Sequence, residues 1–147
     1  FRLRATDGAG NTSAWLYGPT FKPVMSQDTS TAVHYSYSAW GKATSVYASG
    51  GTLHYTSKSG AYAYQTFTGS SVAWVAYKGP NRGKASVYVD GVFIQTVDLY
   101  SATYSNKVVV FTRTWSVNGT HTIKIVNQAT AGHPRIDLDG FARVALS

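Results

Sequence analysis

The chain has 147 residues, enough for one domain with a full core, and its hydrophobic share of 44% excludes a disordered polymer. It contains no cysteine, which excludes disulfides, thiolate metal sites and cysteine nucleophiles. The formal net charge is +7, but the 13 Lys and Arg residues are spread along the chain instead of clustered, so nucleic acid is not the expected partner.

The composition predicts an all-β protein. All 6 acidic residues are Asp, Glu is absent and Gly occurs 14 times. Helices favour Glu, whereas strands and turns favour Val, Thr, Tyr and Gly. No apolar run approaches the ~20 residues of a membrane span, so we predict none. Because the first residue is Phe, we expect the chain to come from a longer precursor.

Residues 1–30 form the first of two predicted segments, a strand arm with its linker. Residues 1–21 contain two short strands around the turn cluster Asp7-Gly-Ala-Gly-Asn11. With its strand ending in Arg-Ala-Thr-Asp, this pattern resembles the last two strands of a fibronectin type III or related immunoglobulin-like domain. Two strands alone cannot bury a core, so we expect them to pair with another sheet edge. The candidate assembly residues are Phe1, Leu3, Tyr17 and Phe21.

Residues 31–147 predict an antiparallel β-sandwich, a jelly roll of about eight strands, to which the N-terminal pair is an addition. Asp90-Gly91 is a strong signal for a tight hairpin, and we expect further tight turns at Gly69-Ser70 and Asn118-Gly119. Trp74 lies in an apolar run and is expected in the core. The expected strands are Leu53–Tyr55, Tyr62–Phe67, Val72–Tyr77, Lys84–Val89, Val92–Leu99, Lys107–Arg113, His121–Val126 and Arg135–Val144.

Short motifs in this second segment carry a resemblance. They are Phe67-Thr-Gly, Trp74, Gly79-Pro-Asn-Arg-Gly-Lys-Ala, Val87-Tyr-Val-Asp-Gly, Val97-Asp-Leu-Tyr, Asn118-Gly-Thr-His-Thr-Ile and Ile136-Asp-Leu-Asp-Gly-Phe. As a set they resemble a galactose-binding-like jelly-roll module, the fold of several carbohydrate-binding module families in secreted bacterial proteins. The resemblance implies an extracellular location, secreted or cell-surface attached, and a glycan or cell-wall polymer as partner.

The direction of the strands predicts a loop-rich end opposite Asp90-Gly91, formed by residues 78–83, 100–106 and 127–134. Tyrosine rings stack on the apolar faces of sugars, while Asn, Arg and His donate hydrogen bonds to hydroxyls or carboxylates. The alternative is that these are ordinary turn residues. The candidate ligand-binding residues are Lys78, Asn81, Arg82, Tyr100, Tyr104, Asn106, His133 and Arg135, with Trp40 as a further stacking platform.

We predict no cofactor and no enzymatic activity. Asp137 and Asp139 stand two residues apart on one strand and would face the same side, which makes them weak candidates for a structural Ca²⁺ site. Solvated carboxylates, or partners for Arg135 and Arg143, are the alternative interpretation. Glycosidases need two carboxylates across a cleft, and the chain has no Gly-x-Ser-x-Gly or His-Glu-x-x-His motif.

Two functional interpretations follow from these observations. The first is a non-catalytic extracellular binding or adhesion module directed to a glycan or the cell envelope. The alternative is a structural subunit of an extracellular filament or adhesin that self-associates through its N-terminal strands. An unpaired strand edge favours this alternative because it invites pairing with another chain.

Overall fold

The computed structural model describes residues 2–18, 20–36 and 38–146, and it confirms an all-β antiparallel sandwich. One short 3₁₀ helix, η1 (Ser49–Gly51), interrupts the strands. The strands are β1 (Arg2–Leu3), β2 (Leu16–Tyr17), β3 (Phe21–Gln27), β4 (His34–Tyr35), β5 (Gly41–Thr44), β6 (Thr52–Thr56), β7 (Tyr62–Lys78), β8 (Lys84–Val89), β9 (Val92–Asp98), β10 (Ser105–Asn127), β11 (Ile136–Leu138) and β12 (Gly140–Leu146).

Two strands, β7 and β10, run through positions where the sequence predicts turns. The expected breaks at Gly69-Ser70 and Asn118-Gly119 are wrong, because Gly69 and Gly119 pair with each other inside the β7–β10 ladder. A register shift in this ladder lies between Thr114 and Gly119, where β10 has more residues than β7. A Cβ on Gly69 would lie 2.7 Å from the Val144 carbonyl oxygen, so glycine is needed for close backbone approach and not for a turn.

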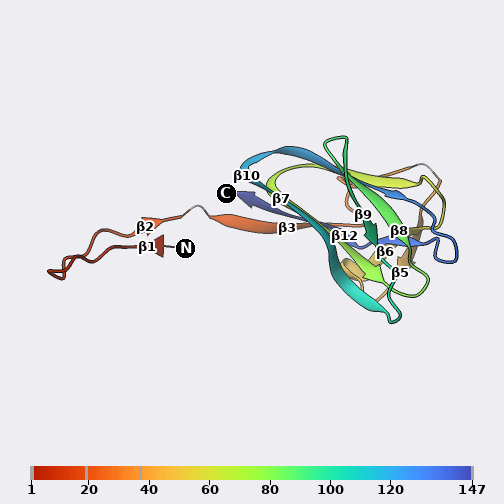
Figure 1. The fold of residues 1–147 in the computed structure, drawn as a ribbon, viewed down its shortest axis with the longest axis horizontal. Helices are drawn as coiled ribbons and strands as arrows, with labels where there is room; N and C mark the ends of the chain where they lie inside the picture. The colour runs from red at the N-terminus through yellow and green to blue at the C-terminus, as the bar shows by residue number, and fades with distance from the viewer. Residues whose placement is uncertain (1, 19, 37, 147) are drawn as a thin grey trace.

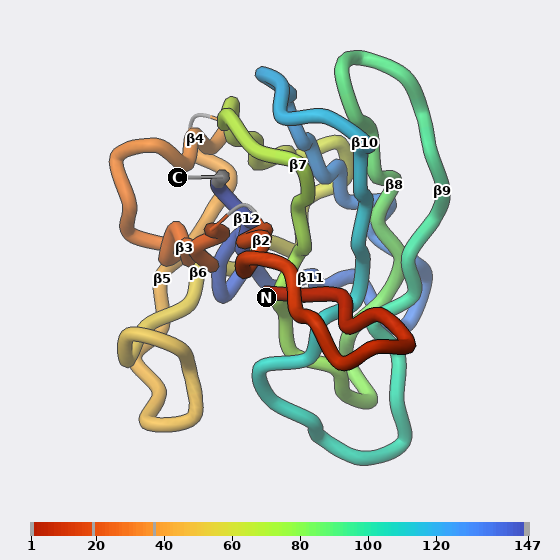
Figure 2. The backbone as a smooth tube through the Cα atoms, turned by 90° about the vertical axis from the view of Figure 1, so that its left-hand side faces the viewer, coloured from red at the N-terminus to blue at the C-terminus, as the bar shows by residue number. Residues whose placement is uncertain are grey.

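The sheets are built around these two long strands. The main sheet has the order β3-β12-β7-β10-β8-β9, with β4 also paired to β7, and a smaller sheet has the order β11-β6-β5. Figure 2 shows β10 lying between β7 and β8. One half of β7 pairs with β12 and the other half with β4, so the long sheet contributes to both sides of the sandwich.

The main core cluster draws buried side chains from both halves of β7, and a smaller second cluster contains Ala48, Leu53 and Tyr77. Ala63 and Phe67 come from the first half, and the fully buried Trp74 from the second half, as predicted. Ile136 and Leu138 of β11 pack against the same cluster. The long sheet therefore bends around its own core, which fixes which side of each strand faces solvent.

The Asp90-Gly91 hairpin between β8 and β9 is confirmed. Both turn residues have positive φ, 52° for Asp90 and 80° for Gly91, the conformation of a type I′ turn. The turn is tied back to the sheet because the Asp90 N–H donates to the Thr122 carbonyl at 2.9 Å.

At the N-terminus, β1 and β2 pair with each other as a small hairpin that Figure 1 shows extending away from the sandwich. Leu3 and Tyr17 are exposed there, whereas Phe1 lies outside the described residues. Phe21 begins β3, which pairs with β12 over residues 21–27 and so is part of the main sheet. The division of the chain at residue 30 stays a prediction.

In the part of the chain that the structure describes, we find no helix with the length and hydrophobicity required to cross a membrane.

Candidate functional site

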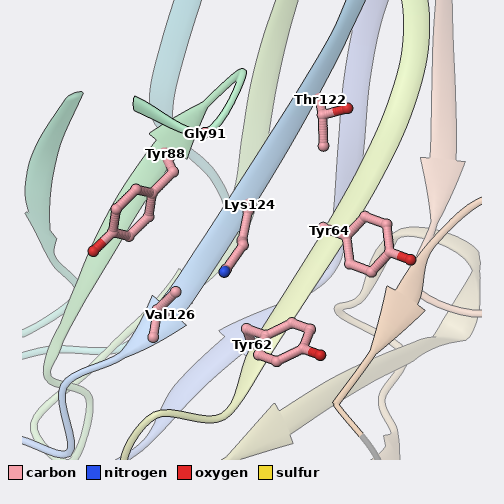
Figure 3. A pocket seen from close by; sticks show the side chains of 7 residues that line it. All are labelled: Tyr62, Tyr64, Tyr88, Gly91, Thr122, Lys124 and Val126. Atoms are coloured by element: carbon pink, nitrogen blue, oxygen red, sulfur yellow. The ribbon is translucent and has the colours of Figure 1, made fainter. Parts of the chain in front are cut away.

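A groove of about 590 Å³ lies on the outer face of the main sheet, over β7, β10 and β8. Figure 3 shows three tyrosines and a lysine projecting from this face. The residues that line it are Tyr62, Tyr64, Tyr88, Gly91, Thr122, Lys124 and Val126. We call this site the tyrosine groove.

Strand alternation directs these side chains outward. On β7, Ala63 and Gln65 are buried, so Tyr62 and Tyr64 face solvent. The other strands follow the same alternation: Tyr88 stands between the buried Val87 and Val89, and Lys124 stands between the buried Ile123 and Ile125. The groove residues are therefore the outward-facing positions of strands whose alternate residues are buried in the core.

The strand registers align five side chains in one row across the sheet. His34 of β4 is opposite Tyr64 of β7, which is opposite Lys124 of β10. Lys124 is in turn opposite Tyr88 of β8, which is opposite Phe93 of β9. His34 stacks on Tyr64 with ring centroids 4.9 Å apart, and Tyr88 meets Phe93 edge-on at 5.7 Å. The row therefore has an aromatic pair on either side of a central cation.

The lysine is held by aromatic rings. Its Nζ lies 4.9 Å from the ring centroid of Tyr62 and 5.7 Å from that of Tyr88. A cation over a ring face is attracted by the ring quadrupole. Lys124 thus fills the middle of the groove with its stem and presents its ammonium group among the rings.

The side chains of the groove are of types that bind ligands through ring faces, hydroxyl groups and a cation. The lining residues include three tyrosines, one lysine and one threonine, and no carboxylate or histidine. Beside it, Thr66 and Thr122 share a hydrogen bond of 2.8 Å between their hydroxyls, which fixes two polar groups at one end.

The structure brings most of the predicted loop-end residues together, at the opposite end from Asp90-Gly91. Gly79 and Tyr100 form a β-bridge, as do Arg82 and Arg135. The His133 Nδ1 atom lies 2.6 Å from the Pro80 carbonyl oxygen. The prediction that three separate loops meet at this end is therefore confirmed by their contacts.

Arg82 is buried within this loop end and connects its segments through hydrogen bonds. Its Nε donates to Asp137 Oδ2 at 2.6 Å, and its Nη1 donates to Asn81 Oδ1 at 2.5 Å. The Nε of Arg135 donates to the other carboxylate oxygen of Asp137 at 2.7 Å, while its guanidinium lies 4.0 Å from the ring centroid of Tyr55. Both arginines thus pair with Asp137 within the fold. For Arg135 this agrees with the alternative interpretation, in which the aspartates are partners of arginines and not calcium ligands.

The aromatic residues of the loop end remain accessible. Tyr100 is 47% exposed and lies 4.8 Å from the His133 ring, and Tyr104 is 61% exposed with its ring 5.3 Å from the Arg82 guanidinium. Lys78, paired with Ser105 at the end of β7, is half-buried, and Asn106 is exposed on β10. A ligand site at the loop end therefore stays a prediction, separate from the tyrosine groove.

Within the described residues, the hydrogen bond and ring contact of Trp40 join it to Tyr62 and Tyr35 and not to the loop end. Its indole N–H donates to the Tyr62 carbonyl at 3.0 Å, and its ring packs at 5.1 Å against Tyr35. The side chain is half-buried against the core cluster. Trp40 therefore supports the backbone at Tyr62, where β7 starts.

The two aspartates considered for Ca²⁺ do not form a shared site. Both carboxylate oxygens of Asp137 are occupied by arginines, whereas those of Asp139 accept the Ser49 N–H at 2.8 and 3.1 Å. Burial raises the pKa of Asp139, which the Ser49 hydrogen bond opposes. Among the described residues no group of three or more His, Asp or Glu side chains could hold a metal ion. These residues do not fit a calcium site.

Sequence reasoning missed the tyrosine groove. The signal was present within single strands, because Tyr62, Tyr64 and Tyr88 occupy the outward positions of alternating segments. Their alignment with Lys124 depends on the registers of β7, β8 and β10, and no local pattern specifies those registers.

Two known enzymes are similar to this chain over a small part of their own length. The chain is 31% identical over 153 residues to the A type blood N-acetyl-α-D-galactosamine deacetylase of Flavonifractor plautii, covering 97% of this chain and 19% of the deacetylase. It is 39% identical over 89 residues to the A type blood α-D-galactosamine galactosaminidase of the same organism, covering 60% of this chain and 8% of that enzyme. The chain thus spans less than a fifth of either relative. No family model matches the sequence.

Solved structures establish the fold. A family 35 carbohydrate-binding module from Clostridium thermocellum superposes with a TM-score of 0.59 at 15% identity, covering 83% of this chain and 98% of the module. The CBM36-1 domain of a multidomain xylanase from the hindgut metagenome of Trinervitermes trinervoides gives 0.55 at 11% identity, covering 86% and 98%. The chain has the galactose-binding-like β-sandwich fold that these carbohydrate-binding modules share.

Proposed function

We propose that this chain is a non-catalytic glycan-binding module of a larger extracellular protein, and that the tyrosine groove is its binding face. The observation that carries the proposal is the row His34–Tyr64–Lys124–Tyr88–Phe93, which crosses five neighbouring strands. The partner is a glycan or a cell-wall polymer. Secretion or attachment to the cell surface is part of the same proposal.

Sugar recognition is consistent with this geometry. The C–H faces of a sugar ring are apolar and pack on aromatic rings, while hydroxyl groups need donors and acceptors at the rim. The rings of Tyr64 and Tyr88 are carried by β-strands, so little conformational freedom is lost on binding. Thr122 and the tyrosine hydroxyls supply polar groups around them.

The relatives support an accessory role. The two Flavonifractor plautii enzymes have different names and activities, a deacetylase and a galactosaminidase, and both share sequence with this chain. A stretch common to two different catalysts, and covering 19% and 8% of them, is expected to serve a shared task such as holding a glycan.

The experiment is a glycan array followed by titration calorimetry on the ligand found, using the full chain. We expect Tyr64→Ala and Tyr88→Ala each to weaken binding about 30-fold, the loss of about 2 kcal/mol typical of a buried aromatic anchor. Tyr104→Ala is the matched control, because Tyr104 is an exposed tyrosine at the loop end. If Tyr104→Ala abolishes binding while both groove variants retain it, the ligand site is the loop end and the groove proposal is wrong.

The second interpretation, a filament or adhesin subunit, rests on the N-terminal hairpin. Leu16 and Tyr17 of β2 are 65% and 68% exposed, and β1–β2 pair only with each other among the described strands. An exposed apolar two-stranded edge is suited to pairing with a second chain. Size-exclusion chromatography over a concentration series tests it: a monomer at all concentrations, with or without residues 1–17, excludes self-association.

A further inference from the structure

The tyrosine groove contains one charged residue, Lys124, which forms no ion pair with any residue that the structure describes. None of the residues lining the groove is acidic. Across the described part of the chain, the recorded ion pairs join other residues, and Lys124 forms none. Its recorded partners are the ring faces of Tyr62 and Tyr88, which attract the cation without cancelling its charge.

We propose that the groove selects glycans that carry an anionic group, a carboxylate or a sulfate, and that Lys124 pairs with it. This inference rests on the proposed function, since it assumes that the groove binds a glycan. It goes further by assigning the class of ligand and the residue that determines it.

The position of Lys124 in the row supports this assignment. Tyr64 and Tyr88 are its direct neighbours in register on either side. A sugar ring stacked on one of these tyrosines would place a substituent beside the ammonium group. A hydrogen bond between ions is about twice as strong as a neutral one, so an acidic substituent gains more there than a hydroxyl.

Exclusion of water strengthens the same preference. Lys124 is half-buried among aromatic side chains, and a ligand that covers the groove would remove more of its water. A cation that loses water without gaining an anion is destabilised. A neutral glycan therefore meets a penalty in the middle of the row that an anionic glycan offsets. The formal charge of +7 also favours the approach of anionic ligands.

The test uses ligand pairs that differ only in charge. One pair is keratan sulfate and its chemically desulfated form, and the other is a sialylated mucin glycan and its desialylated form. Calorimetry with the full chain is expected to show tighter binding to the charged member of at least one pair. The two pairs distinguish a sulfate from a carboxylate as the preferred group.

Three variants separate the specific effect of Lys124 from general charge attraction. Lys124→Gln is expected to weaken binding of the charged glycan about tenfold, and binding of the neutral form should stay the same or become tighter. Lys124→Arg is expected to retain the preference. Lys42→Gln removes the same charge from the exposed face of β5 and is expected to have little effect.

The outcomes distinguish this inference from the proposed function. Equal weakening by Lys124→Gln and Lys42→Gln, or equal affinity for both members of each pair, overturns the anion preference while leaving glycan binding intact. If a 20-nucleotide single-stranded DNA binds more tightly than every glycan, the ligand class is wrong. If no glycan binds, or if Tyr64→Ala and Tyr88→Ala change nothing, the proposed function itself fails.

Discussion

Arg82 and Asp137 form an ion pair in the interior of the loop end, with the guanidinium Nε 2.6 Å from the carboxylate Oδ2 and the Asp137 side chain fully buried. Arg82 leads into β8, whereas Asp137 lies in β11, so the pair joins segments 55 residues apart. The loop end is therefore held together from the inside, beneath the exposed rings of Tyr100 and Tyr104.

Arg82→Met is expected to destabilise the protein by about 3 kcal/mol, because it leaves part of a buried carboxylate charge uncompensated. Arg135→Met is the matched control and should cost less, since the Arg135 side chain is 24% exposed against 7% for Arg82. Urea denaturation measures both. An equal loss of unfolding free energy in both variants, or a larger loss for Arg135→Met, would show that Arg82 is not the more important partner of Asp137.

Gly79 and Gly83 should respond very differently to alanine. A Cβ on Gly83 would lie 2.0 Å from the His133 carbonyl oxygen, so backbone must move and we expect a loss of about 3 kcal/mol. A Cβ on Gly79 would clash with the ring of Tyr104, which is exposed and can swing aside, and would make an ordinary contact of 3.6 Å with Arg82 Cδ, so we expect a loss below about 1 kcal/mol. Thermal unfolding of both variants checks this order, and the reverse order would contradict it.

Acid stability should depend on Asp90. Burial opposes ionisation of its carboxyl, but hydrogen bonds from His121 and from the Thr122 N–H, both 2.8 Å, outweigh it and hold the pKa of Asp90 below its usual value. A lowered folded-state pKa gives stability that is complete above the unfolded pKa of about 4 and is lost as the pH falls through the folded value.

Asp90→Asn is therefore expected to flatten the fall in melting temperature between about pH 5 and pH 2. Asparagine also suits the first position of this turn, so the hairpin itself should persist. Asp98→Asn serves as the charge-matched control on β9. Parallel curves for wild type and Asp90→Asn would contradict the prediction.

Removing divalent metal should not change the melting temperature. Both oxygens of Asp137 accept from arginines, and among the described residues no group of three or more His, Asp or Glu side chains could hold a metal ion. Differential scanning calorimetry in EGTA and in excess Ca²⁺ gives the comparison. A lower melting temperature in EGTA that Ca²⁺ restores would contradict this reading of both carboxylates.

The β1–β2 hairpin should be dispensable for the stability of the sandwich, whereas β3 should contribute to it. Deleting residues 1–17 removes only the β1–β2 hairpin, and the stability should be unchanged. Deleting residues 1–27 also removes β3 and its ladder to β12, exposing a long edge of the main sheet. We expect the second deletion to lower the melting temperature by several degrees or cause aggregation. Equal behaviour of the two deletions would show that β3 contributes little.

The sequence predicted those features that depend on neighbouring residues. Asp90-Gly91 specifies its own turn, and the strand direction that follows from it places Tyr100 and His133 at the same end. Local reasoning failed at Gly69, because a glycine needed for close backbone approach has the same sequence signature as one needed for a turn.

Two further features required the three-dimensional structure. Arg82 is buried because it pairs with Asp137 of β11, which lies far along the chain. The sequence around Arg82 is that of a polar loop, and it therefore suggested a ligand-binding residue instead of a structural one. The alignment of Tyr64 with Lys124 and Tyr88 depends on two strand registers that long-range pairing decides.

The five-strand row also sets a length scale. Neighbouring strands lie about 4.8 Å apart, so the four intervals from His34 to Phe93 give the row a span of about 19 Å. Backbone hydrogen bonds fix that spacing, and the side chains can adjust it only slightly. If the groove binds a glycan as proposed, affinity is expected to rise with each added sugar ring up to a span of about 19 Å and not beyond it.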